Sequence, residues 1–167
     1  YGSVFIADAL PSLPPEALPP QLRHLPLVVK RANTGAQRDL ADLQREVNVL
    51  QQCSHPHLLP LFGYCLELES PCLVFPLMRH GNFADRLWPS KADPEHQLRR
   101  LGLSAPLRPL QWRERLNVLH QATEALLYLH TISVIHRDFK PENILLDDDL
   151  GAFLADTGFA KMEHTGS

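Results

Sequence analysis

The sequence predicts an α+β fold in which a sheet-rich first part is followed by a mainly helical second part. Three observations lead to this prediction. Short apolar and β-branched runs come first, one amphipathic helical pattern interrupts them, and the longest helical pattern follows. The 167 residues are 44% hydrophobic and 21% charged, which is typical of a globular domain and excludes a disordered, collagen-like or coiled-coil protein.

The charge balance excludes two kinds of partner. Sixteen Lys and Arg stand against 19 Asp and Glu, a formal net charge of −3, so the net field of the chain does not draw it to nucleic acid or anionic lipid. No apolar run reaches the roughly 20 residues that span a bilayer, and the N-terminus shows no secretory signal pattern. We therefore expect no nucleic acid partner and no membrane segment in this chain.

The three cysteines, Cys53, Cys65 and Cys72, follow no zinc-binding spacing. Their odd number indicates no disulfide framework, and free thiols of this kind suit a reducing compartment. The sequence therefore predicts neither a structural metal nor a set of structural disulfides.

In the first half of the chain, apolar periodicity predicts three strands and one helix. Residues 27–30 are a short β-branched run that predicts a strand, and residues 58–66 and 71–78 predict two more. Residues 36–52 place apolar side chains on one face of an amphipathic helix. The apolar positions of this helix are Leu40, Leu43, Val47 and Leu50.

The second half begins with the longest helical pattern, over residues 111–131. Its leucines predict the buried face of a helix. These leucines are Leu116, Leu119, Leu126 and Leu127. Residues 144–146 and 152–154 then predict a hairpin of two short strands around the aspartates at 147–149.

Most of the 15 prolines fall in stretches without periodicity. Each proline removes a backbone donor and pushes the preceding residue toward extended geometry, so residues 8–26 predict a surface loop with polyproline character. This loop is either a plain insertion or a ligand for a proline-binding domain. Residues 88–110 mix Pro, Gly and charge in the same way and predict a second irregular stretch.

The segment from His136 to Asn143, HRDFKPEN, carries the strongest chemical signal in the sequence. It resembles the catalytic loop of protein kinases; the alternative is a polar turn at the end of a helix. The resemblance implies that Asp138 orients a substrate hydroxyl or accepts its proton, that Lys140 neutralises the transferring phosphoryl group, and that Asn143 offers an oxygen to Mg²⁺. Placement and charge neutralisation of this kind are what phosphoryl transfer requires.

Downstream of this loop, Asp156-Thr157-Gly158 looks like the Asp-Phe-Gly metal site of the same family. Asp156 keeps the carboxylate that is expected to bind Mg²⁺. Thr157 departs from the family pattern, because the aromatic residue found there in the family docks beneath the regulatory helix. We expect this departure to weaken the active arrangement.

Two residues in the first half complete the charged set. Lys30 ends the strand LVVK, which resembles the Val-Ala-Ile-Lys signature, and would contact the α- and β-phosphates of ATP. Glu46 projects from the apolar face of the helix at 36–52, where a carboxylate is costly unless it is paired. Lys30 is its expected partner, and the alternative is a solvated Glu at the margin of that face. Val28 stands where the family has Ala against the adenine ring, so we expect a narrower nucleotide slot.

By the same resemblance, other residues would bind the nucleotide. The first five residues look like the second half of a glycine-rich loop, and residues 73–78 look like the hinge strand, with Phe75 as the gatekeeper. Asp85 would hold the ribose hydroxyl. The expected nucleotide-binding positions are Gly2, Val4, Val28, Lys30, Phe75, Leu77, Met78, Asp85 and Leu145.

Further segments resemble one branch of the family. Residues 79–87 look like the hinge exit of receptor-like kinases and of the Pelle and interleukin-receptor-associated group, and residues 110–116 strengthen that likeness. Lys140 at its position is the serine/threonine-type pattern. Arg137 precedes the catalytic Asp, and in the family this Arg pairs with a phosphate on the activation segment.

Taken together, the resemblance implies a bilobal protein-kinase-like fold. Residues 1–78 would form the N-lobe, with the Pro-rich insert at 8–26, and residues 79–167 the hinge exit and a partial C-lobe. Because both ends fall inside family motifs, we expect the chain to be a fragment of the domain. The implied function is that of a cytoplasmic serine/threonine kinase that transfers the γ-phosphoryl of ATP to protein hydroxyls with Mg²⁺, and its parent protein is free to be membrane-tethered. The alternative is a pseudokinase or scaffold with little or no phosphotransfer.

Overall fold

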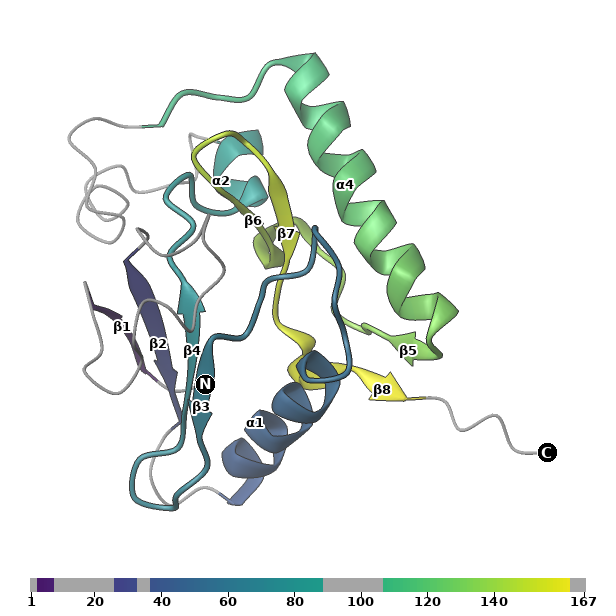
Figure 1. The fold of residues 1–167 in the computed structure, drawn as a ribbon. Coiled ribbons are helices and arrows are strands. Elements are labelled where there is room, and N and C mark those ends of the chain that lie inside the picture. Colours follow the sequence, from purple (N-terminus) through teal and green to yellow (C-terminus); the bar gives the residue numbers. More distant parts are fainter. Residues whose placement is uncertain (1–2, 8–25, 33–36, 89–106, 163–167) are drawn as a thin grey trace.

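A sheet and one helix form the first part of the molecule, and a long helix with two short two-stranded sheets forms the second (Figure 1). The computed structural model describes residues 3–7, 26–32, 37–88 and 107–162. Gly2, residues 8–25 of the expected insert and residues 89–106 of the second irregular stretch lie outside these ranges. The strands and helices are β1 (Ser3–Ala7), β2 (Leu27–Arg31), α1 (Gln37–Leu50), β3 (Gly63–Cys65), β4 (Cys72–Pro76), α2 (Phe83–Leu87), α4 (Trp112–Thr131), β5 (Val134–Ile135), β6 (Ile144–Leu146), β7 (Ala152–Leu154) and β8 (Lys161–Met162), with 3₁₀ turns η4 (Pro141–Asn143) and η5 (Thr157–Phe159).

The first four strands form one antiparallel sheet in the order β1-β2-β4-β3. The strand predicted at 27–30 is confirmed as β2, and the helix predicted at 36–52 is confirmed as α1. Leu43 and Val47 of α1 pack with Leu73 and Phe75 of β4 in one apolar cluster. Burial of this stripe therefore holds α1 against one face of the sheet.

Two of the predicted strands are much shorter than the sequence indicates. The run at 58–66 forms a strand only over β3, and Leu58 makes just an isolated bridge to Leu154. Pro60 lies inside this run and has no N–H for a ladder, which explains the late start of the strand. The run at 71–78 forms β4 and then leaves the sheet after Pro76.

Helix α4 confirms the helix predicted at 111–131, but its buried face is not the one predicted. Leu116, Leu119 and Leu127 are exposed, and Leu126 is half-buried. The side chains that face the core are Val118, Ala122, Ala125 and Leu129. This stripe also repeats with helical spacing, and its two alanines let the helix approach β7 closely, because they occupy little volume.

The hairpin predicted at 144–146 and 152–154 is confirmed as β6 and β7. Its turn is closed by the Asp147 carboxylate, whose Oδ1 accepts the N–H groups of Asp149 at 3.0 Å and Gly151 at 2.7 Å. Gly151 is required here, since an added Cβ would lie 2.8 Å from Asp147 Oδ2. Leu150 adopts a left-handed conformation with φ of 62°.

Four of these strands and helices were not expected from the sequence pattern. Strand β1 lies in the segment that resembles only part of a glycine-rich loop. Helix α2 lies in the segment predicted only as a hinge exit, and its N-cap Asn82 accepts the backbone N–H of Asp85. Strands β5 and β8 pair with each other and are two residues long. Runs this short carry too little periodicity to be predicted.

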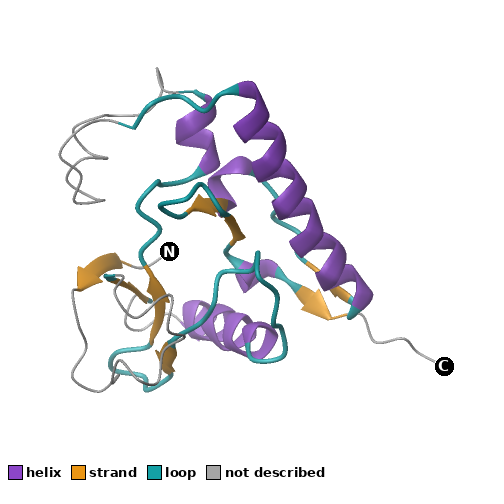
Figure 2. Ribbon diagram, turned by 45° about the horizontal axis from the view of Figure 1, so that its top comes forward, coloured by secondary structure: helices purple, strands orange, loops and turns teal. Residues whose placement is uncertain are grey.

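The α+β class expected from the sequence is confirmed. The apolar core forms two clusters, one between the sheet and α1 and one between α4 and the β6–β7 hairpin. In Figure 2, the sheet and α1 lie together on one side, and the long helix α4 lies on the other. The chain passes from one part to the other directly after β4, and the division into lobes at residues 78 and 79 remains a prediction. Within the described residues, every helix is too short or too polar to cross a membrane.

Candidate active site

A lysine on β2 lies between two carboxylates from different parts of the chain. Lys30 Nζ donates to Glu46 Oε2 of α1 at 2.9 Å and to Asp156 Oδ1 at 3.2 Å. The lysine side chain is 21% exposed and that of Glu46 is 3% exposed. The structure thus contains the Lys30–Glu46 pair that the sequence predicts, and it adds Asp156 as a second partner.

The position of Glu46 follows from the phase of α1. Glu46 comes three residues after Leu43 and one before Val47, so it shares the face that the helix turns to the sheet. Burial raises the pKa of the Glu46 carboxyl, Lys30 opposes this shift, and the net pKa remains above its ordinary value. The carboxylate is therefore stable at this position only because a cation neutralises it.

Lys30 responds to the same surroundings in the other direction. Burial lowers the pKa of its ammonium group, but the carboxylates of Glu46 and Asp156 more than offset this, and the net pKa is raised. The ammonium therefore stays charged at neutral pH. It is a fixed positive charge at the junction of the sheet, α1 and the segment that follows β7.

The loop between β5 and β6 arranges a second charged set. Asp138 Oδ2 accepts Lys140 Nζ at 2.7 Å and Asn143 Nδ2 at 2.8 Å, and Asn143 Nδ2 also donates to the Asp138 carbonyl at 2.9 Å. Pro141 opens the 3₁₀ turn η4, which brings Asn143 back to Asp138. The hydrogen bond from Lys140 lowers the pKa of Asp138, and the same bond raises the pKa of Lys140. Asp138 is thus an ionised and oriented carboxylate.

His136 and Ala155 connect this loop to the segment that carries Asp156. His136 Nδ1 accepts the Asp138 backbone N–H at 3.3 Å, which assigns the ring proton to Nε2, and this N–H donates to the Ala155 carbonyl at 3.0 Å. The Ala155 N–H donates to the Asn143 carbonyl at 2.8 Å. Burial lowers the pKa of His136, so the ring is neutral and acts as a structural link between the two segments.

Two non-glycine residues beside these groups adopt the left-handed conformation. Asp156 has φ of 61° and Arg137 has φ of 63°. Such residues are uncommon and carry local strain, which concentrates at functional sites. Arg137 Nε donates to the Phe159 carbonyl at 2.6 Å. Both strained positions therefore lie where the loop at 136–143 and the turn η5 meet.

Turn η5 packs against α1. Arg45 of α1 donates to the Gly158 carbonyl at 2.9 Å and to Asp42 at 2.7 Å. Thr157 is buried in this contact, and its hydroxyl has no hydrogen-bond partner among the described residues. The departure from the aromatic residue seen in the sequence thus leaves a buried polar atom unsatisfied, which is unfavourable.

The side chains of Asn143 and Asp156 suit a hard divalent cation. The Asn143 amide nitrogen is used by Asp138, which leaves its amide oxygen as the ligand atom, and Asp156 is partly exposed with a carboxylate oxygen beyond the one that meets Lys30. Mg²⁺ is bound by a few such oxygens together with water and phosphate oxygens. The described residues contain no cluster of three or more His, Cys, Asp or Glu that could bind a metal.

Four of the expected nucleotide-binding residues gather at one place. Phe75 and Met78 belong to the apolar cluster beneath the sheet, and Val28 and Leu145 pack against it. Val28 and Phe75 are direct neighbours across β2 and β4, and Leu145 comes from β6 in the second part of the chain. These side chains form an apolar contact between the two parts.

The remaining expected nucleotide-binding residues are not brought together in the same way. Val4 is 62% exposed on β1, opposite Lys30. Leu77 is buried, and its N–H donates to the Pro26 carbonyl at 2.7 Å. Asp85 accepts Asn82 Nδ2 at 3.0 Å. Gly2 lies outside the described residues.

A cavity of about 720 Å³ opens beside the charged cluster. It is lined by α1, by the end of β2 and by residues 158–162, and Lys30, Glu46 and Asp156 form part of its wall. Phe75 and Leu145 do not line it. The cavity therefore adjoins the charged end of the site and is separate from the apolar contact.

Two residues that help to hold the site together, Arg45 and Ala155, carry no signal in the sequence. Arg45 reaches Gly158 across 113 positions of sequence, and nothing in the helical pattern marks that contact. Ala155 bonds to the loop at 136–143 through both its N–H and its carbonyl, and it also packs against the apolar cluster beneath the sheet. Neither contact has a sequence signal, because both depend on how distant segments meet.

Comparison with known proteins identifies the family. The family model described as "Protein tyrosine and serine/threonine kinase" matches residues 1–166. The chain belongs to the protein kinase family. This match covers nearly the whole chain and includes the segment at 136–143, which resembles a kinase catalytic loop.

Plant proteins are among the relatives of this kinase chain. It is 37% identical over 138 residues to a nodulation receptor kinase of Pisum sativum, covering 81% of the chain and 14% of that protein. It is 40% identical over 142 residues to the probable serine/threonine-protein kinase PBL10 and 39% identical over 139 residues to the serine/threonine-protein kinase BIK1, both of Arabidopsis thaliana. These matches cover 84% and 82% of the chain, and 31% and 32% of the two relatives. The chain thus spans a third or less of the length of these relatives.

Proposed function

We propose that this kinase chain belongs to an active serine/threonine kinase that transfers the γ-phosphoryl group of ATP to protein hydroxyls. The observation that carries the proposal is the position of Lys30, which is hydrogen-bonded to both Glu46 and Asp156. A charged lysine held by two carboxylates supports binding of phosphate oxygens, since it is oriented before any ligand arrives. The serine/threonine kinases among the relatives support the choice of acceptor.

Asp138 is proposed to orient the substrate hydroxyl. Its carboxylate is ionised, and Lys140 and Asn143 hold one of its oxygens, Oδ2. The serine or threonine hydroxyl would donate to the carboxylate, which fixes the direction of attack and can take up the departing proton. Lys140 also lies at the exposed edge of this group, where it would neutralise charge on the transferring phosphoryl.

Asn143 and Asp156 would hold Mg²⁺ through their oxygens. When bound, the cation would neutralise phosphate charge at this position. The contribution of the chain is to fix these two side chains relative to one another. Ala155 does this, because its N–H bonds the Asn143 carbonyl while the residue itself precedes Asp156.

The apolar contact formed by Val28, Phe75, Met78 and Leu145 is proposed as the adenine-binding region. Adenine presents two flat apolar faces, and residues from both parts of the chain would cover them. Binding there would place the phosphates toward Lys30, which follows Val28 by two positions on the same face of β2.

A second candidate function is that of a binding or scaffold module with little phosphotransfer. Thr157 favours it, because the buried unsatisfied hydroxyl weakens the packing of η5 against α1. That contact carries Asp156 at its N-terminal side and Glu46 on the helix. A loosened contact would lower the population of molecules with both carboxylates on Lys30.

The two functions are separated by one experiment. The protein and its Asp138→Asn variant are titrated with Mg²⁺-ATP in a thermal-shift assay and then assayed for transfer of labelled phosphate to a serine-containing protein. The active-kinase proposal expects stabilisation by the nucleotide in both proteins and a loss of transfer of about 10³-fold or more in the variant. Exposed Asp148→Asn is the matched control and should retain transfer. If Mg²⁺-ATP stabilises the protein but no phosphate transfer is lost in the Asp138→Asn variant, only the scaffold function remains.

A further inference from the structure

The β3–β4 hairpin ends in two cysteines that face each other. Cys65 is the last residue of β3 and Cys72 is the first residue of β4, and the strand register makes them direct partners. Only the loop of residues 66–71 separates them. Their spacing in the sequence matches no motif, so the pairing is visible only from the register.

The geometry of such a pair is close to that of a disulfide. Directly opposed residues of antiparallel strands have Cα atoms about 4.5–5.5 Å apart, and disulfides join Cα atoms about 4.4–6.8 Å apart. The two side chains also lie on the same face of the sheet, since opposed residues always do. The strands therefore need little movement to join the two sulfur atoms.

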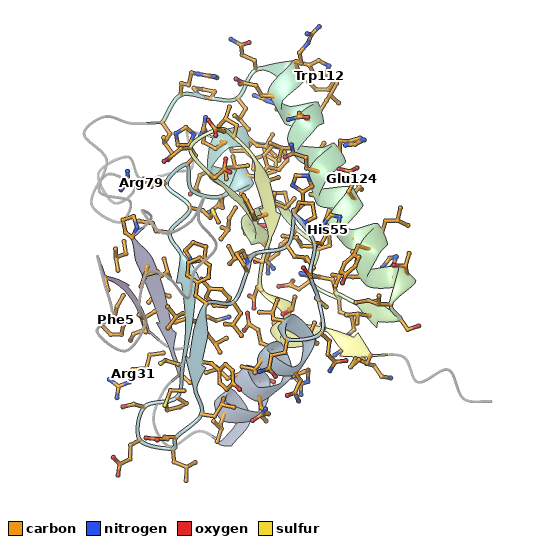
Figure 3. The ribbon with its side chains drawn as sticks, viewed as in Figure 1. Phe5, Arg31, His55, Arg79, Trp112 and Glu124 are labelled. Carbon is orange, nitrogen blue, oxygen red and sulfur yellow. The ribbon has the colours of Figure 1, made fainter. Side chains whose placement is uncertain are left out.

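The two cysteines lie partly exposed on the face of the sheet away from α1. Leu73 and Phe75 point toward α1, so the alternate residue Cys72 points to the opposite face. Figure 3 shows Arg31, the partner of Cys72 on β2, projecting from the side of the sheet away from α1. Both cysteines are half-buried. The loop between them includes Leu68, which is 75% exposed.

The surroundings of Cys72 support close contact between the two thiols. Burial raises the pKa of the Cys72 thiol, Cys65 raises it further, and a hydrogen bond to the Cys65 backbone and the charge of Arg31 oppose the shift. Arg31 also donates to the Glu69 carbonyl and to Ser70 Oγ, each at 3.4 Å. The net pKa of the Cys72 thiol is raised, so its surroundings favour the neutral thiol, and the pairing of the two cysteines depends on the strand register.

We propose that Cys65 and Cys72 are a reversible oxidation site that forms a cross-strand disulfide. The bond would tie β3, at the edge of the sheet, to β4, which runs on to the expected adenine-binding residues. This site is distinct from the phosphotransfer site, because its thiols lie on the face of the sheet opposite to Glu46 and α1.

A small-molecule disulfide such as oxidised glutathione supplies the oxidising equivalents. One cysteine thiolate attacks a glutathione sulfur, forms a mixed disulfide and releases one glutathione thiolate. The second cysteine then attacks the protein-bound sulfur, forms the bond between the two Sγ atoms and releases the second glutathione thiolate. Two cysteine thiols are oxidised, one glutathione disulfide is reduced to two thiols, and the released thiolates take up the two protons.

The third cysteine provides a matched control. Cys53 is also half-buried, but it lies after α1 and packs against the cluster formed by α4 and the β6–β7 hairpin. It has no cysteine opposite it in the described strands. Replacing it by serine should leave the oxidation of the other two cysteines unchanged.

The test is carried out on the Cys53→Ser protein in glutathione redox buffers. Cleavage after Glu67 and Glu69 separates the two remaining cysteines, so a linked peptide pair in the mass spectrum reports their disulfide. The measurement is made under native conditions and again in urea that unfolds the chain. A folded state that favours the pairing should raise the equilibrium constant for disulfide formation by about tenfold over the unfolded chain.

The same coupling predicts a change in stability. Oxidised protein should melt about 3–6 °C higher than reduced protein, and the Cys65→Ser and Cys72→Ser variants should show no such shift. An equilibrium constant that is equal or smaller under native conditions would overturn the proposal. So would a disulfide that, in the protein with all three cysteines, involves Cys53.

Discussion

At the scale of single residues, the site is organised by one cation between two carboxylates. Lys30 lies between Glu46, which is nearly inaccessible to solvent, and Asp156, which is partly exposed. A buried ion pair of this kind adds little to the free energy of folding, because the cost of removing both charges from water opposes their attraction. Removing only one partner is costly, since the other charge is then buried alone.

We predict that Lys30→Met lowers the free energy of unfolding by about 2 kcal/mol at pH 7. The loss should be smaller at pH 5. The pKa of Glu46 is raised in the native state, so the native state binds this proton more readily than the unfolded chain does. Stability therefore falls as pH rises through the native pKa, and removing the lysine enlarges that effect. Urea unfolding at the two pH values measures it.

The double variant Lys30→Met with Glu46→Gln is the control for this prediction. It removes both the Lys30 and the Glu46 charge, and the Asp156 carboxylate that also loses its partner is partly exposed, so the variant should recover most of the lost stability and lose the pH dependence that comes from Glu46. A double variant as unstable as Lys30→Met would show that the buried charge of Glu46 is not the cause of the loss.

Thr157 gives a second prediction at the residue scale. Thr157→Val keeps the shape of the side chain and removes the hydroxyl that lacks a partner, so it should raise the free energy of unfolding by about 1 kcal/mol. Thr131→Val is the control, because the exposed Thr131 hydroxyl donates to the Tyr128 carbonyl and its removal gains nothing. Thermal or chemical denaturation compares the two; a stability loss for Thr157→Val would mean that the hydroxyl is satisfied.

At the scale of elements, the turn of the β6–β7 hairpin fixes the spacing between the loop at 136–143 and Asp156. The turn depends on the Asp147 carboxylate, which accepts two backbone N–H groups. The hairpin in turn packs against α4, so errors in the turn reach both the core and the site.

Gly151→Ala tests this turn. The added Cβ would lie within 2.8 Å of Asp147 Oδ2, so the carboxylate must move and release its hydrogen bonds. We expect a loss of about 1–2 kcal/mol in the free energy of unfolding. Asp149→Ala keeps the backbone N–H that Asp147 accepts and should change stability by less than about 0.5 kcal/mol. Equal effects in the two variants, measured by urea unfolding, would contradict the clash.

At the scale of the whole molecule, α4 presents two apolar stripes and buries only one of them. Trp112 is 72% exposed and Leu127 is 64% exposed, and Leu116 and Leu119 lie between them on the outer side of the helix. Figure 3 shows Trp112 at the N-terminal end of this helix. A continuous apolar surface of this kind promotes association.

The chain is therefore expected to self-associate in solution. Leu116→Lys combined with Leu119→Lys should shift it toward the monomer in size-exclusion chromatography with light scattering, without loss of helical content by circular dichroism. Val118→Lys is the contrasting variant, because Val118 is fully buried and a charge there should unfold the chain. A monomeric starting protein would refute the prediction.

The sequence by itself determined the α+β class, helices α1 and α4 and the inner strand β2, because local periodicity carries that information, and the contiguous motif at 136–143 indicated the kinase family. It also predicted the Lys30–Glu46 pair, since a carboxylate on an apolar helix face is costly unless it is paired, and the structure rather than the sequence excluded a solvated Glu46. Only the tertiary structure decided which stripe of α4 is buried, because both stripes have helical spacing. The stripe with Ala122 and Ala125 is the buried one, because these small side chains allow close packing. It alone decided the contact of Arg45 with Gly158 and the opposition of Cys65 and Cys72. Those contacts depend on how distant segments meet and on strand register, and neither leaves a pattern along the chain.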